Sequence, residues 1–446
     1  MLSICWLVLT AFPAFAQAPV APFILQRPPA LPTCAASYGP SGVTTVGGTK
    51  TFAPKGNLYC LAEDGPWADK ASSLLRQLMQ LAIAVGPTTS VRMSADYYDG
   101  VLVAGWLCSL PGASLASLEI VVQRADTTLP NPDNHLAPEF LRKTLSCFNK
   151  VSIVSVGCDY YAPGAATNAC PANQTNSHHI KGISIKGDRG TVYAFGTGNM
   201  TVSSLSRNVE FWMVGTAERP LPQFECLFDF SEALATHPDM KFWQEKAVYD
   251  ACASFAAPLQ DVQVVVLPFG EREFKDKVEQ EFKKSKKVTM VGEFFESAWL
   301  FDLVAKYPEV ETTFLVDSAY HYAAIGDETA SFNFVTHASA ARLMDFLKQH
   351  PSARVRYLQT NHHFAYHGQT NTVHARSILF ESDVESSMMV GSAHWRDGAF
   401  RSNTEAQIFL SGEAAKVERQ VMDDLISRSI VEAELPLNST PAMIEN

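Results

Sequence analysis

The feature that most constrains this 446-residue sequence is an internal repeat at a displacement of 195 residues. His179 is matched by His374 (374 − 179 = 195), and the same displacement relates further polar and glycine positions. These pairs are Lys181 and Arg376, Asp188 and Asp383, Gly196 and Gly391, Thr197 and Ser392, Asn199 and His394, Asn208 and Asn403, and Glu210 and Glu405. Self-similarity at a fixed displacement is typical of duplicated structural units. It predicts two homologous lobes.

Apolar periodicity predicts that both lobes alternate helices with strands. The first copy predicts helices near 67–85, 98–109 and 137–148 and strands at 90–95, 118–123 and 151–156. The second predicts helices near 274–285, 295–306 and 338–349 and strands at 288–291, 313–317 and 354–358. This pattern is typical of α/β folds. We expect lobes at 61–225 and 226–430, each a mixed sheet flanked by helices, between a Pro-rich lead-in (17–60) and a C-terminal tail (431–446).

Each copy places a histidine and a cation two residues apart. On a strand this spacing puts both side chains on one face, as for His179 with Lys181 and for His374 with Arg376. If the lobes meet, two imidazoles and two cations line one cleft. One neutral imidazole can attack phosphorus while the other protonates the leaving alkoxide, and the cations stabilise the phosphoryl oxygens. The pattern therefore predicts a phosphodiester substrate, with no metal or cofactor required.

The stretches 179–210 and 374–405 resemble the duplicated H-x-K and G-S-x-N motifs of the phospholipase D superfamily. The resemblance implies two α/β lobes that share one active site at their interface and a two-step phosphohistidine mechanism without metal. It implies that the histidines are nucleophile and acid, that the cations bind phosphate, that an Asn and a His assist, and that two glutamates orient the imidazoles. These site residues are His179, His374, Lys181, Arg376, Asn199, His394, Glu210 and Glu405.

The second copy departs further from the family pattern than the first. Arg376 replaces a lysine, which changes the donor geometry, and His394 replaces an asparagine. Both copies also lack the family's aspartate seven residues after the histidine and have one two positions later, at Asp188 and Asp383. The sequence does not fix the order of roles. Because its partners Lys181 and Asn199 follow the family pattern, His179 is favoured as the nucleophile.

The N-terminal segment is typical of an export signal. Residues 2–15 are almost wholly apolar, and Ala14–Ala16 has the small-x-small pattern of a cleavage site, although no basic residue precedes the run and an anchor helix is the alternative. Cleavage after Ala16 leaves eight cysteines, an even number that predicts disulfides in a secreted protein. Cys158–Cys170 is the best local pairing. Zinc is disfavoured because no C-x-x-C pair occurs.

Three functions remain open for the sequence. The first is a secreted, monomeric phosphodiesterase that hydrolyses a phospholipid head-group ester and has no membrane-spanning segment after cleavage. The second is a nuclease with the same chemistry, and the third is a catalytically inactive binding protein with the same fold. The formal net charge of −11 disfavours nucleic acid as a partner.

Three other features bear on partners. The basic run 283–287 fits contact with an anionic membrane surface or the solvated end of a helix, which we favour. His362, His363 and His367 fit a cleft rim better than a metal site, because the segment has the composition of a loop. Glycosylation sequons begin at Asn173, Asn199 and Asn438.

Overall fold

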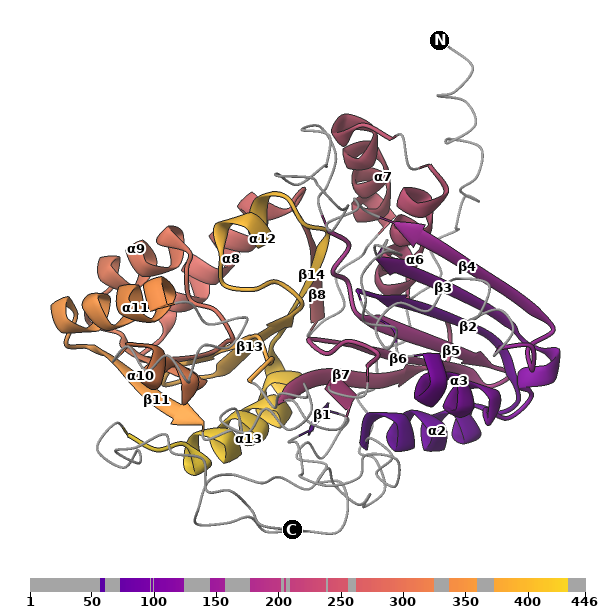
Figure 1. Ribbon diagram of the computed structural model, residues 1–446, viewed down its shortest axis with the longest axis horizontal. Helices are drawn as coiled ribbons and strands as arrows, with labels where there is room; N and C mark the ends of the chain where they lie inside the picture. The colour runs from indigo at the N-terminus through magenta and orange to yellow at the C-terminus, as the bar shows by residue number, and fades with distance from the viewer. Residues whose placement is uncertain are drawn as a thin grey trace.

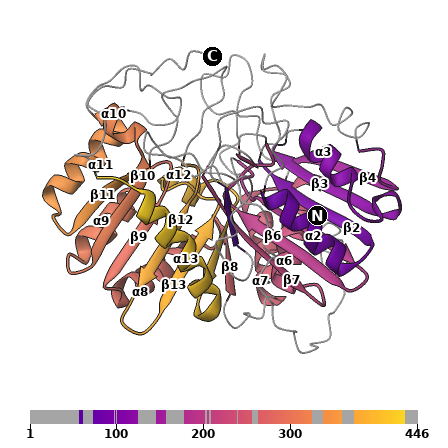
Figure 2. The same cartoon turned by 90° about the horizontal axis from the view of Figure 1, so that it is seen from below.

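A computed structural model shows two α/β lobes side by side (Figures 1 and 2). It describes residues 57–60, 73–96, 98, 100–123, 145–156, 177–201, 204–205, 209–237, 240–255, 262–324, 337–358 and 373–431. Each lobe contains a mixed seven-stranded sheet with helices against it. The predicted fold class is confirmed.

The first sheet combines a parallel half with an antiparallel half. Its strands lie in the order β4 (Lys150–Val156), β3 (Ser117–Gln123), β2 (Thr88–Ala95), β5 (Gly182–Gly187), β6 (Gly190–Gly196), β7 (Glu210–Ala217) and β1 (Asn57–Cys60). The helices of this half of the chain are α2 (Ser73–Val85), α3 (Gly100–Cys108), the short 3-10 helix η2 (Ala113–Leu115), α6 (Pro222–Thr236) and α7 (Phe242–Phe255).

The second sheet repeats this order position by position. Its strands are β11 (Ala353–Leu358), β10 (Glu311–Asp317), β9 (Lys287–Val291), β12 (Ser377–Glu381), β13 (Ser386–Gly391), β14 (Glu405–Leu410) and β8 (Val262–Leu267). The helices are α8 (Glu271–Lys284), α9 (Ala298–Lys306), α10 (Ala319–Ala324), α11 (His337–Gln349), α12 (Asp397–Arg401) and α13 (Gly412–Arg428). Two sheets with one topology are the structural counterpart of the sequence repeat.

The predicted elements match the observed ones closely. All six predicted strands end at the predicted residue and begin one or two residues earlier than expected. Five predicted helices overlap observed ones, which are α2, α3, α8, α9 and α11. Most of the helix expected at 137–148 lies outside the described residues, and its described part, 145–148, forms a turn.

An apolar core runs across the boundary between the lobes. Phe224 and Leu227 of α6 belong to the same buried cluster as Leu379 of β12, Ile408 of β14 and Leu425 of α13. Burial of each large aliphatic side chain stabilises the fold by about 1.5–3 kcal/mol. The two lobes therefore share one core at their junction, and this junction positions the candidate site.

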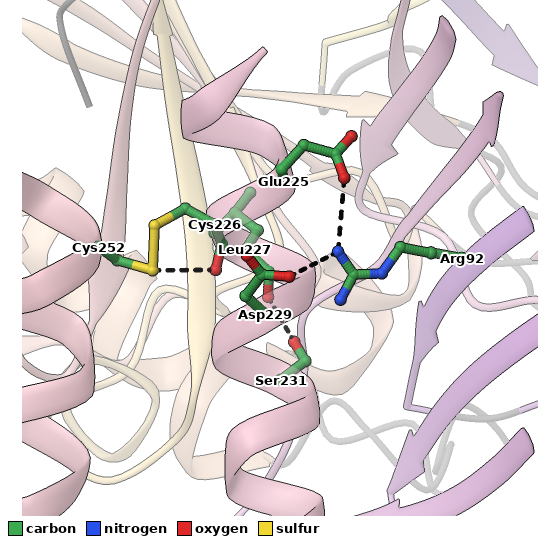
Figure 3. The surroundings of a disulfide bond; sticks show 7 residues. All are labelled: Arg92, Glu225, Cys226, Leu227, Asp229, Ser231 and Cys252. Carbon is green, nitrogen blue, oxygen red and sulfur yellow. Dashed lines mark hydrogen bonds and ion pairs between the residues drawn. A yellow bond between two sulfur atoms is a disulfide. The ribbon is translucent and has the colours of Figure 1, made fainter. Parts of the chain in front are cut away.

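Two disulfides lie within the described residues, Cys108–Cys147 and Cys226–Cys252. The second joins α6 to α7, and on the neighbouring face of α6 the guanidinium of Arg92 on β2 bonds the carboxylates of Glu225 and Asp229 (Figure 3). Disulfides are typical of oxidising, non-cytosolic compartments. The predicted pair Cys158–Cys170 lies outside the described residues.

No described helix is both long enough and apolar enough to cross a membrane.

The basic run 283–287 spans the end of α8 and the start of β9. Lys286 forms an ion pair of 2.6 Å with Asp383, and Lys287 one of 3.0 Å with Glu381. Because nearby carboxylates balance these cations, the contacts favour the solvated helix end over a membrane-binding patch.

Candidate active site

Each candidate histidine precedes a hairpin of its own lobe and is hydrogen-bonded to the backbone of the other lobe. The amide of His179 donates to the carbonyl of Thr404 at 2.8 Å, and the amide of His374 donates to the carbonyl of Val209 at 3.1 Å. Thr404 and Val209 come directly before β14 and β7. These bridges set each histidine beside the glutamate that opens the opposite strand.

The imidazoles and glutamates therefore pair across the lobe boundary. Nδ1 of His179 lies 2.8 Å from Oε2 of Glu405, and Nδ1 of His374 lies 2.6 Å from Oε1 of Glu210. Burial alone would raise the pKa of each carboxyl, but the adjacent imidazole, hydrogen bonds and a buried cation lower it below its ordinary value. Both glutamates are thus charged and can orient an imidazole.

The G-(T/S) segment of each copy holds the glutamate of the same lobe. The hydroxyl of Thr197 donates to the carboxylate of Glu210 at 2.6 Å. In the same way, the hydroxyl of Ser392 donates to the carboxylate of Glu405 at 2.6 Å. The preceding residue must be small. A Cβ atom at Gly196 would overlap the carbonyl of Phe211, and one at Gly391 would overlap the side chain of Gln407. Close strand packing therefore explains the repeated glycine.

The two cations are almost wholly buried. Nζ of Lys181 donates to the carbonyl of His179 at 3.0 Å, and burial lowers the pKa of Lys181 to about 8. Nη1 of Arg376 donates to the carbonyl of Thr197 at 2.9 Å, so this guanidinium connects the lobes. Burial also lowers the pKa of Arg376, but from a value so high that it stays charged.

The sequence prediction missed two buried acids, Asp96 after β2 and Glu293 after β9. They occupy equivalent places in the two lobes. In each lobe one residue of the preceding strand pairs with the first residue of the hairpin that follows the repeated histidine and cation, and the acid lies two residues after that strand residue. The facing residues are Ser94 with Gly182 and Val291 with Ser377. Their displacement is 197 residues (293 − 96 = 197), so a search at 195 does not align them. A search for polar residues at the ends of equivalent strands would have found both.

Each of these acids contacts the imidazole and the cation of its own lobe. Oδ2 of Asp96 lies 3.1 Å from Nε2 of His179 and 3.7 Å from Nζ of Lys181. Burial opposes its charge, but these two groups hold the pKa of Asp96 well below its ordinary value. Oε2 of Glu293 lies 3.4 Å from Nη2 of Arg376. Each imidazole thus faces a carboxylate of the other lobe at Nδ1 and an acid of its own lobe near Nε2.

The Nε2 atoms of the two imidazoles face groups of opposite kind. Nδ1 of His179 lies beside the carboxylate of Glu405 and the carbonyl oxygen of Ser392, and its Nε2 lies beside the carboxylate of Asp96, so both ring nitrogens face acceptors. Nε2 of His374 lies 2.6 Å from Nη2 of Arg376, which can only donate. Nε2 of His374 therefore faces a hydrogen-bond donor.

His394 lies close to both repeated histidines. Its ring centroid lies 5.3 Å from that of His179 and 6.0 Å from that of His374. Burial and the charge of Arg376 lower the pKa of His394 well below its ordinary value, so it is neutral. Asn199, its partner in the repeat, is buried, and its Oδ1 accepts no hydrogen bond from the described part of the chain.

Other predicted residues lie elsewhere. Asp188 and Asp383 occupy the turns at the far ends of β5 and β12, and both are exposed. Asn208, Asn173, Asn438 and the three histidines at 362, 363 and 367 lie outside the described residues. The burial of Asn199 leaves no room for a glycan in the folded protein.

Glu293, His374 and His394 could offer three ligand atoms to a metal ion, all within 4.8 Å of one another. Nη2 of Arg376 occupies the middle of this group. It lies 2.6 Å from His374, 2.7 Å from His394 and 3.4 Å from Glu293. A fixed positive charge at this position disfavours a metal cation.

The fold of the chain resembles that of a known structure. Phosphatidylserine synthase from Haemophilus influenzae superposes with a TM-score of 0.53 at 12% identity, over 81% of this chain and 85% of that one. The chain has the two-lobed phospholipase D fold. Its motif resemblance is therefore confirmed at the level of fold.

Two further solved structures superpose less closely on this chain. Yeast tyrosyl-DNA phosphodiesterase has a TM-score of 0.47 at 12% identity, over 77% of this chain and 88% of that one. Polyphosphate kinase from Porphyromonas gingivalis has a TM-score of 0.46 at 11% identity, over 82% of this chain. The chain spans about half, 49%, of that kinase. No protein-family model and no curated protein matches the sequence.

We expect the kcat/KM of this protein to decline above pH 8. The phosphate-binding role predicted for Lys181 requires its cationic form, and with its pKa lowered to about 8 it loses its proton as the pH rises through that value. The measurement is kcat/KM from pH 6 to 10, which should fall about tenfold per pH unit above 8. Lys181→Met should be slow at every pH and lack this decline. A wild-type profile that stays flat to pH 10 would contradict the assignment.

Proposed function

We propose that this protein hydrolyses the head-group phosphodiester of a phospholipid through a phosphohistidine intermediate, with His374 as nucleophile and His179 as acid. The observation that carries the proposal is the opposite hydrogen bonding of the two Nε2 atoms. Nε2 of His179 faces the acceptor Oδ2 of Asp96 at 3.1 Å and in this proposal carries the proton, whereas Nε2 of His374 faces the donor Nη2 of Arg376 at 2.6 Å and carries the electron pair. This order is the reverse of the one that the sequence favours.

The first step exchanges one bond to phosphorus for another. The electron pair on Nε2 of His374 forms a P–N bond, and the P–O bond to the head-group alcohol breaks. The proton on Nε2 of His179 moves to the leaving oxygen, so the alcohol departs neutral. Lys181 and Arg376 stabilise the negative charge on the phosphoryl oxygens.

The second step reverses the roles of the imidazoles. Water attacks phosphorus and gives its proton to Nε2 of His179, which becomes an imidazolium again. The P–N bond breaks, its electron pair returns to His374, and phosphatidic acid is released. Glu405 and Glu210 hold the two rings in place at Nδ1 throughout the cycle.

The charge distribution supports lipid over nucleic acid as substrate. The chain has a formal net charge of −11, and the site contains four carboxylates, Asp96, Glu210, Glu293 and Glu405, against the cations Lys181 and Arg376. Nucleic-acid binding draws most of its affinity from several cations along the phosphate backbone. A head-group ester brings one phosphate charge. The two described disulfides support export of the protein after removal of its leader.

The test is hydrolysis of two substrates in parallel with a metal chelator present. We expect choline release from phosphatidylcholine vesicles and no shortening of single-stranded DNA at the same enzyme concentration. Activity that survives the chelator fits a reaction carried by the two imidazoles. Shortened DNA without choline release would replace the lipid substrate with nucleic acid, and activity restored only by added zinc would contradict the phosphohistidine route.

A further inference from the structure

We propose that Asp96 binds a positively charged group on the head-group alcohol, two carbon atoms from the ester oxygen, and so selects amino-alcohol esters such as those of choline or ethanolamine. This inference rests on the proposed function. It assigns a substrate-binding role to a side chain that belongs to neither motif copy.

The first argument is that the reaction removes both partners of Asp96. Among the described residues its close polar partners are Nε2 of His179 at 3.1 Å and Nζ of Lys181 at 3.7 Å. In the proposed reaction the proton on Nε2 of His179 turns to the leaving oxygen, and Lys181 turns to a phosphoryl oxygen. Asp96 is only 6% exposed, so it would remain as a buried, unpaired carboxylate. Such a charge is costly unless the substrate supplies a cation.

The second argument is the position of Asp96 relative to the leaving oxygen. That oxygen must approach Nε2 of His179, and Oδ2 of Asp96 lies 3.1 Å from the same nitrogen. In a 2-aminoethyl ester, the nitrogen lies about 3–4 Å from the ester oxygen when the chain is folded, given bond lengths near 1.5 Å. The ammonium group therefore falls within reach of the carboxylate as His179 releases it.

The equivalent acid of the second lobe provides a matched comparison. Glu293 lies near Nε2 of His374 and Arg376, on the side of the nucleophile, and it also contacts Nδ1 of neutral His394 at 3.4 Å. It keeps this imidazole as a partner when Arg376 turns to the phosphate. Removing its charge alters the net charge of the cleft as much as removing that of Asp96. Only Asp96 is expected to sense the head group.

The experiment compares phosphatidylcholine with phosphatidyl-3,3-dimethylbutanol, in which carbon replaces the quaternary nitrogen. The two lipids, with acyl chains of different mass, compete at low mole fraction in micelles of neutral detergent, and the ratio of the two phosphatidic acids gives the ratio of kcat/KM. We expect the wild-type enzyme to prefer the choline ester at least tenfold. In Asp96→Asn the ratio should fall towards one, whereas Glu293→Gln should keep it. The ratio cancels any loss of rate common to both substrates.

The outcomes separate the two proposals. Equal hydrolysis of both lipids by the wild-type enzyme would overturn the role of Asp96 and leave the phospholipase activity standing. Hydrolysis of neither would reject both. An equal drop of the ratio in Glu293→Gln would show that overall charge, and not contact with Asp96, makes the choice. If Asp96→Asn does not fold, the wild-type ratio and the Glu293→Gln ratio still decide the matter.

Discussion

His374→Ala is expected to abolish turnover and formation of the phosphoenzyme, whereas His179→Ala is expected to abolish turnover alone. In the proposed mechanism His374 supplies the electron pair that attacks phosphorus, so its loss should lower kcat by about 10⁴-fold or more. His179 supplies a proton that an alkoxide needs and p-nitrophenolate does not. With a p-nitrophenyl ester of phosphatidic acid, His179→Ala should therefore still give a burst of nitrophenolate. It should also accumulate phosphohistidine, because no base is left to activate water for the second step. Loss of this acid should slow alkyl esters by about 10²–10⁴-fold.

The measurement is stopped-flow absorbance of the burst, with trapping of labelled enzyme under alkaline denaturing conditions. His178 offers a matched control next in the sequence. It is buried, its Nε2 lies 2.7 Å from the hydroxyl of Ser94, and burial lowers its pKa to about 3, so it is neutral and structural. His178→Asn should keep the burst. A burst in His374→Ala together with none in His179→Ala would restore the order that the motif pattern favours.

The architecture was predictable because its signals are local and are repeated. Strand β2 ends at Ala95 and β9 ends at Val291. The apolar residues of these strands are followed by Asp96 and by Gly292. A strand has an apolar pattern with a period of two, so the sequence alone shows where such a pattern stops. The fixed displacement then predicted one topology for both lobes.

The site was predictable in part. Crossed pairing of each imidazole with the glutamate of the other lobe depends on the bridges of His179 to Thr404 and of His374 to Val209, which no local pattern encodes. The acid Asp96 was hidden because the two copies differ in length between the strand and the histidine. The proton states depend on which nitrogen faces Arg376, and only the packed site determines that.

Arg376→Met should lower both stability and activity. The guanidinium is fully buried, donates to the first lobe at the carbonyl of Thr197, and balances the buried charge of Glu293. Methionine fills much of the same volume without charge, so the buried carboxylate of Glu293 would lose its cationic partner Arg376 and keep the imidazoles of His374 and His394 nearby. Breaking one side of a buried ion pair costs about 3–5 kcal/mol, which urea denaturation would detect. We expect kcat/KM to fall by about 10²–10³-fold, because the proposed mechanism then lacks one of the two cations that stabilise the phosphoryl oxygens.

The double variant Arg376→Met, Glu293→Gln separates these two effects. Removing the unpaired carboxylate should recover at least half of the lost free energy of unfolding, because the cost arises from the uncompensated charge. Activity should stay low, because glutamine restores no cation at the phosphate. If the double variant is as unstable as Arg376→Met alone, the cost comes from the lost contact with Thr197 between the lobes, and Arg376 is then a structural link first. Recovery of stability without activity would instead mean that Arg376 serves catalysis. The protein would then be about as stable with uncharged side chains at positions 376 and 293.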